Sequence, residues 1–106
     1  MKNLKVIRSL ETLRDLEEIH FVISLDNPEV ADRFLEAITY SPRALCHHPN
    51  LGPRYQSDNP ELLGLRFWPV RNFRNYLIFY RPEPEADILR GVRILHGARD
   101  ISSELQ

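Results

Sequence analysis

The amino-acid sequence predicts an α+β fold, in which an N-terminal strand and a helical hairpin pack on a twisted antiparallel sheet. Two segments in the first half repeat apolar residues at helical spacing, whereas three segments in the second half are rich in aromatic and β-branched residues. A chain of 106 residues has room for one core. We therefore expect a single domain over residues 1–106, with a helical hairpin at about 9–48, a loop at about 49–60 and the sheet at about 61–98.

The chain begins with a short strand that leads into an amphipathic helix. Residues 4–8 (LKVIR) are apolar and branched enough to predict a strand, and Ser9 suits the N-cap of the following helix. The apolar stripe of this helix consists of Leu13, Leu16, Ile19, Val22 and Ile23. The side chains that we expect to face water are Arg14, Asp15, Glu17 and Glu18.

A second helix follows almost at once. Residues 27–29 (NPE) are the types favoured at an N-cap and in a first helical turn. Since a very short connection separates the two helical patterns, we expect an antiparallel hairpin. Pro42 disfavours a continuous helix, so we expect it to stop near Tyr40 and to restart with Ser41 as cap. Residues 47–60 are rich in turn formers and predict a loop.

Three strands are predicted at residues 61–70, 75–82 and 86–96. Their connections are short enough for hairpins, which favours an antiparallel sheet with the helix pair on one face. Strict alternation along the last strand assigns one face to Ile88, Arg90, Val92, Ile94 and His96, and the other to Leu89, Gly91, Arg93 and Leu95. Because both faces are apolar and the helices cover only one, we expect a partner on the other.

Composition narrows the classes of function. The net charge is −1, and the single cysteine excludes an internal disulfide. His47 and His48 are adjacent and have no third ligand near them, so we expect neither a metal nor another cofactor. No stretch reaches the roughly 18 apolar residues of a membrane span, and the N-terminus lacks the pattern of a signal peptide. A cytoplasmic protein without membrane association is expected.

Basic and aromatic residues interleave in the predicted sheet. Residues 62–81 contain four arginines and no acidic residue. Aromatic side chains beside arginines can stack and neutralise RNA, and they are equally typical of protein interfaces. An ordinary solvated strand face fits the charge pattern as well.

Residues 93–100 (RILHGARD) end the last predicted strand with a cluster of polar groups. His96 lies between Arg93 and Arg99, an arrangement that is compatible with catalysis. The structural alternative is a hydrogen-bonded histidine and a local ion pair between Arg99 and Asp100.

Four stretches in this order resemble the RelE/ParE family of bacterial type II toxin–antitoxin toxins. They are DLEEIHFVISLDNPEVADRFLEAI, HPNLG, LLGLRFWPVRNFRNYLIFYRP and VRILHGARDI, and the resemblance runs from about residue 13 to residue 101. It implies a helical hairpin against an antiparallel sheet, as the patterns predict independently. It also implies a small toxin of a plasmid-stabilisation module, neutralised by a cognate antitoxin in a toxin–antitoxin hetero-oligomer.

The resemblance implies one of two activities. RelE-like members cleave mRNA on the ribosome, and the residues that could match their catalytic groups are Arg66, Arg81, Arg93 and His96. ParE-like members inhibit DNA gyrase and need no catalytic residues. The absence of lysine from residues 62–106, the short ISSELQ tail and the wording of LHGARD favour the ParE-like activity. An inactive relative that only binds antitoxin is a third possibility. The expected partner-binding residues are Arg66, Trp68, Arg71, Arg74, Tyr76, Tyr80, Arg81 and Arg99.

Overall fold

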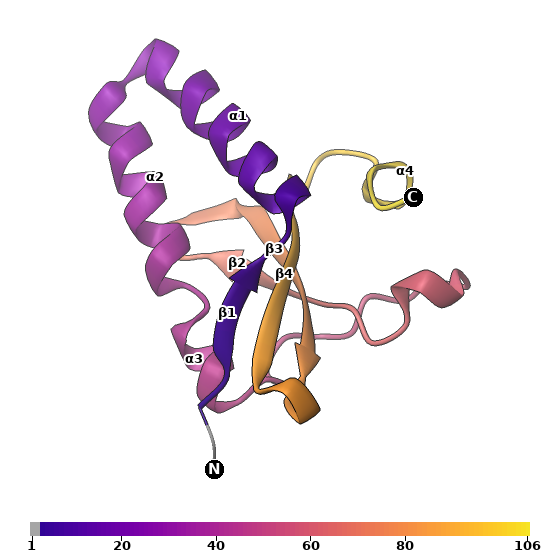
Figure 1. Cartoon of the computed structure of the whole chain (residues 1–106). Coiled ribbons are helices and arrows are strands. Elements are labelled where there is room, and N and C mark those ends of the chain that lie inside the picture. The colour runs from indigo at the N-terminus through magenta and orange to yellow at the C-terminus, as the bar shows by residue number, and fades with distance from the viewer. Residues whose placement is uncertain (1–2) are drawn as a thin grey trace.

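A helical hairpin packs on one face of a four-stranded sheet (Figure 1). The computed structural model describes residues 3–106. The elements are β1 (Lys5–Arg8), α1 (Leu10–Asp26), α2 (Pro28–Tyr40), α3 (Arg43–His47), β2 (Arg66–Val70), β3 (Phe73–Glu83), β4 (Ile88–His96) and α4 (Ile101–Glu104). Single 3-10 turns occur at Pro60–Leu62 and Pro84–Ala86. The predicted α+β fold is confirmed.

The strand order of the sheet is β1-β4-β3-β2. Strands β2, β3 and β4 are antiparallel as predicted, and β1 adds to the β4 edge in parallel. The prediction that residues 61–65 belong to a strand is wrong. Gly64 adopts a φ of 81°, which turns the chain before β2 begins at Arg66.

A side-chain cap begins each helix of the hairpin. Ser9 Oγ accepts from Thr12 N at 3.0 Å, and Asn27 Oδ1 accepts from the first turn of α2, as predicted. The restart after Tyr40 is confirmed, but Ser41 does not cap α3. Its Oγ instead donates to Ala37 O and accepts from Arg71 N at 2.7 Å. Ser41 thus ties the end of α2 to the β2–β3 hairpin.

The main core lies between the helical hairpin and the sheet. Phe34 and Ile38 of α2 meet Ile78 and Ile94 of the sheet, and Phe34 contacts the ring of Phe73 edge-on. Helix α1 contributes Leu16, Ile19 and Ile23. Two residues of the predicted stripe, Leu13 and Val22, are exposed instead, because they lie on the flanks of the narrower strip that meets the sheet.

The second face of the sheet is covered by the chain itself, which corrects the expectation that a partner covers it. Phe79 and Leu95 are buried there beneath Leu62 and Leu65, with Ile101 of α4 packed against the same cluster. Figure 1 shows the segment before β2 and helix α4 on the side of the sheet away from α2. The area over Phe79 and Leu95 is therefore closed to a protein partner, whereas Phe67 and Leu77 on the same face are only partly buried.

A β-bulge breaks the predicted alternation of β4. Phe79 pairs with Arg93, whereas the next residue, Tyr80, pairs with Gly91, so Val92 is an extra residue in the ladder. Because of this extra residue, the side chains of residues 88–92 point to the opposite face of the sheet from the one that strict alternation predicts. Val92 accordingly packs with Phe79 on the second face, and the predicted face assignment before residue 93 is wrong.

Candidate functional site

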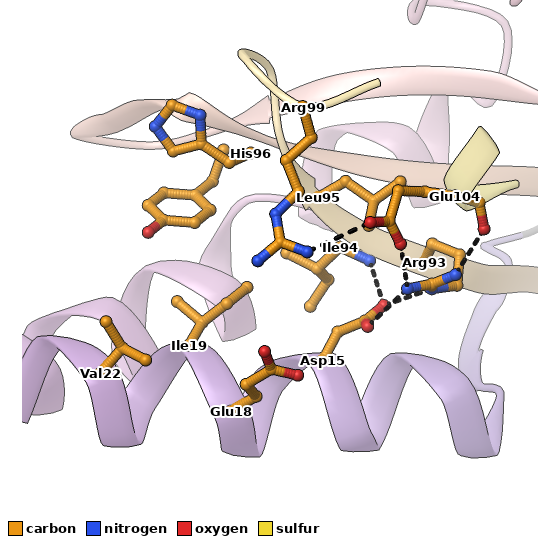
Figure 2. Close-up of a pocket in the computed structure, with 11 residues that line it drawn as sticks. Asp15, Glu18, Ile19, Val22, Arg93, Ile94, Leu95, His96, Arg99 and Glu104 are labelled. Atoms are coloured by element: carbon orange, nitrogen blue, oxygen red, sulfur yellow. Dashed lines mark hydrogen bonds and ion pairs between the residues drawn. The ribbon is translucent and has the colours of Figure 1, made fainter. Parts of the chain in front are cut away.

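A cleft of about 300 Å³ lies between α1 and the end of β4, and we call it the His96 cleft (Figure 2). Helix α1 lines one side and the residues of the RILHGARD segment line the other. The lining residues are Asp15, Glu18, Ile19, Val22, Tyr76, Arg93, Ile94, Leu95, His96, Arg99 and Glu104. Of the four residues considered for RNA cleavage, only Arg93 and His96 are among them.

Asp15 and Arg93 form a bidentate ion pair at the base of this cleft. Arg93 Nε donates to Oδ2 at 2.7 Å and Nη2 donates to Oδ1 at 2.9 Å. Oδ2 also accepts from the backbone N–H of Ile94 at 2.9 Å. The side chain of Asp15 is only 12% exposed, so the prediction that it faces water is wrong. Hydrogen bonding to Asp15 raises the pKa of Arg93, and the guanidinium is thereby committed to a structural contact.

The C-terminal helix α4 supplies a further acceptor to Arg93. Nη1 of Arg93 donates to Glu104 O at 2.7 Å, and Arg99 Nη1 donates to Glu104 Oε1 at 3.2 Å. The predicted pairing of Arg99 with Asp100 is therefore wrong. Asp100 is the N-cap of α4, and its carboxylate accepts from Ser103 N and Oγ.

His96 lines the cleft and accepts a hydrogen bond from the backbone that follows β4. Its Nδ1 accepts from the backbone N–H of Ala98 at 3.0 Å, which requires the neutral ring to carry its proton on Nε2. The ring stands edge-on to Tyr76 with centroids 5.0 Å apart. With one nitrogen accepting from the backbone and the other protonated, His96 has no free lone pair to serve as a general base.

Arg66 and Tyr80 hold the loop that follows α3. Arg66 Nη1 donates to Gly52 O at 2.6 Å, while Tyr80 Oη donates to Pro49 O at 2.7 Å and accepts from Gly52 N at 3.0 Å. Tyr80 is 1% exposed, and burial raises the pKa of its hydroxyl. Its ring is thus inaccessible, which corrects its assignment to a partner-binding surface.

Arg81 has the same kind of role further along the chain. Its Nε and Nη2 donate to the carbonyls of Leu63 and Glu61, at 3.2 and 2.8 Å. These contacts hold the turn before β2 against β3. Three of the four candidate catalytic residues therefore stabilise separate parts of the fold, and they are Arg66, Arg81 and Arg93.

The predicted partner-binding residues Trp68, Arg71 and Arg74 gather along an open groove of about 850 Å³, which we call the hairpin groove. Leu77 of the β2–β3 hairpin and Tyr40 at the end of α2 line it too. Beside it, the guanidinium of Arg43 lies 4.3 Å from the ring centroid of Tyr40, within cation–π range. Tyr40 and Arg43 did not enter the predicted set. The sequence feature that could have indicated them was Pro42, which separates α2 from α3 and so places both residues beside the sheet.

Metal ligands do not cluster in the part of the chain that the structure describes. Among residues 3–106 there is no group of three or more His, Cys, Asp or Glu side chains able to hold an ion. No helix within the same range is long and apolar enough to cross a membrane.

The chain matches the family of the ParE toxin of the type II toxin–antitoxin system parDE over residues 6–101. Comparison with curated proteins gives no match. Among solved structures, the chain is similar to one from the chromosomal ParDE system of P. aeruginosa, with a TM-score of 0.67 and 19% identity over 88% of this chain and 95% of that one. It is also similar to a chain of the RelBE2 toxin–antitoxin complex of Mycobacterium tuberculosis, with a TM-score of 0.59 and 18% identity over 93% and 97% of the two chains. These structures share its fold, and the family match covers nearly all of its sequence: the chain belongs to the ParE toxin family of type II toxin–antitoxin systems.

Proposed function

We propose that this toxin inhibits DNA gyrase in the bacterial cytoplasm, arrests growth, and is held inactive by its cognate antitoxin in a plasmid-stabilisation module. The choice of gyrase as the target rests on one observation: three arginines considered for catalysis already form hydrogen bonds within the chain. Arg66, Arg81 and Arg93 each donate to carbonyl or carboxylate groups of the chain itself. They are positioned to stabilise the fold rather than the charge of a scissile phosphate.

The hairpin groove is the surface that best suits the antitoxin. Trp68 supplies an aromatic wall, and Arg71 and Arg74 form no ion pair with any residue between 3 and 106. An acidic, flexible segment that orders on binding would satisfy both charges. The part of the second face over Phe79 and Leu95 is already filled by Leu62 and Leu65, so it offers no comparable site.

RNA cleavage of the RelE type, with the ribosome and mRNA as partners, is the second candidate. One observation favours it: His96 lies at the rim of a cleft with Tyr76 and Arg99 beside it. A substrate that displaced the Ala98 N–H from Nδ1 would give this histidine a free lone pair. A third candidate is a relative that has lost toxicity and only binds antitoxin.

Induced expression in bacteria, with and without the neighbouring antitoxin reading frame, separates the three. Gyrase inhibition predicts filamentous cells and a DNA-damage response that the antitoxin suppresses. A collapse of translation with intact DNA would contradict gyrase as the target and favour mRNA cleavage. Normal growth, with expression of the protein confirmed, would favour the third candidate, a relative that only binds antitoxin.

A further inference from the structure

The outward face of α1 exposes large apolar side chains that the fold leaves uncovered. Leu10, Phe21 and Leu25 are 58%, 60% and 71% exposed. They lie opposite the side of α1 that packs on the sheet, and Figure 1 shows the tip of the α1–α2 hairpin projecting beyond the sheet. Phe21 and Leu25 lie one turn apart, whereas Leu10 lies about three turns away at the start of the helix. Exposed apolar side chains of this size are candidates for an interaction surface.

Four residues on this face form a row whose spacing is symmetric. Leu10, Arg14, Glu17 and Phe21 follow one another at intervals of 4, 3 and 4 positions. At 3.6 residues per turn, all four fall within an arc of about 60°. Reversing the direction of the helix therefore superimposes the row on itself, with Leu10 in place of Phe21 and Arg14 in place of Glu17.

We propose that two copies of this chain pair through α1, with the helices antiparallel and the two-fold axis between Arg14 and Glu17. In that arrangement Leu10 faces Phe21 of the second copy at both ends of the row. At its centre, Arg14 faces Glu17 of the second copy, twice. A parallel arrangement would instead place Arg14 against Arg14 and Glu17 against Glu17, so the charges select the antiparallel one.

The surface beside the row is hollowed, which leaves room for side chains of a second helix. A shallow hollow of about 580 Å³ lies along α1 and is lined by Arg14, Glu17, Glu18, His20, Phe21 and Ser24. A leucine side chain fits within it, and in the antiparallel arrangement Leu10 of the second copy reaches its Phe21 end.

The pairing leaves the hairpin groove open, because no residue of α1 lines that groove. Two copies would present two such grooves to their partners, and a dimeric partner would gain from binding both. One helix pair covers less than the roughly 1,200–2,000 Å² of a stable interface. We therefore expect a dimer with a dissociation constant of about 1–100 µM.

Sedimentation equilibrium of the full chain, purified away from antitoxin, tests the pairing through charge reversal. Arg14→Glu and Glu17→Arg should each become monomeric, because every central contact then joins like charges. An equimolar mixture of these two variants should dimerise, because each Glu then faces an Arg. Asp26→Arg is the matched control: it reverses a charge on the same helix outside the row, and it should dimerise as the unmodified protein does.

Circular dichroism of every variant keeps folding separate from association. A wild-type protein that stays monomeric at about 100 µM would overturn the proposal. So would two folded single variants that dimerise as well alone as in the mixture.

Discussion

At the scale of single residues, the Asp15 carboxylate accepts a backbone hydrogen bond from β4 that a neighbouring strand would otherwise accept. Strand β1 pairs with β4 only as far as Gly91, so the backbone N–H of Ile94 has no strand neighbour on that side. Asp15 accepts from this N–H and from Arg93 at once. In the sequence, Asp15 stands among charged residues on the polar side of a helix, and nothing there indicates where β1 will end. The caps Ser9 and Asn27 were predictable, since they act on neighbours in the chain.

We expect Asp15→Ala to lower the free energy of unfolding by about 2–3 kcal/mol, because it leaves the partly buried Arg93 guanidinium with only the more distant Glu104 carboxylate, at 3.6 Å, as counter-ion. Urea denaturation of the variant measures the loss. Asp26→Ala, which removes an exposed carboxylate from the same helix, is the control and should change little. Equal stability of the two variants would show that the Asp15–Arg93 pair does not hold α1 to β4.

Glu83 provides a test of electrostatics between β3 and β4. Its hydrogen bond from Arg90 lowers the pKa of the Glu83 carboxyl below its ordinary value. Stability from this pair is therefore complete above the unfolded pKa of about 4.3 and is lost as the pH falls through the lower folded pKa. An NMR titration should find that Arg90→Gln raises the pKa of Glu83. An unchanged pKa would mean that the pair does not persist in solution.

At the scale of elements, the loop after α3 is held as a unit by Tyr80 and Arg66. Gly52 is required there, because an added Cβ would lie 2.5 Å from both Phe67 O and Tyr80 Oη. The sequence predicted a loop from its turn formers, but it could not show that this segment and the residues after it cover the second face. That arrangement depends on contacts between distant residues. The bulge at Val92 was hidden for the same reason, since alternation alone cannot locate an unpaired residue.

Removing the Tyr80 hydroxyl should release this loop. Tyr80→Phe leaves Gly52 N–H and Pro49 O without their partner, at a cost of about 1–3 kcal/mol. Hydrogen exchange should then accelerate at Gly52 while α1 and α2 stay protected. Exchange that accelerates equally throughout the chain would indicate global destabilisation rather than loop release.

At the scale of the whole molecule, a chain with a net charge of −1 places at one end of its sheet two arginines, Arg71 and Arg74, that form no ion pair with residues 3–106. The fold class and the family were predictable from the sequence, because both depend on the order of the elements and on short local sequence motifs. The choice between the proposed targets was less predictable, because it rests on which arginines the fold engages. The sequence alone does not distinguish among the seven arginines of residues 62–106. In the structure, the side chains of Arg66, Arg81 and Arg93 form hydrogen bonds within the chain. Those of Arg71 and Arg74 line the hairpin groove instead.

Replacing Arg71 and Arg74 together by alanine should weaken antitoxin binding by about tenfold or more and reduce its dependence on salt. Isothermal titration calorimetry at two salt concentrations measures both effects. Lys5→Ala removes an exposed cation from β1, the strand at the opposite edge of the sheet, and should leave the affinity unchanged. Equal effects of the two changes would mean that the hairpin groove is not the antitoxin surface.

We propose that this toxin acts by binding gyrase and not by chemistry at His96. The most direct measurement is a supercoiling assay with purified gyrase and micromolar toxin, comparing the wild type with His96→Ala. We predict equal inhibition by both proteins, reversed by the antitoxin. Supercoiling that proceeds unaffected, together with mRNA cleavage in a translation extract that His96→Ala abolishes, would contradict the claim.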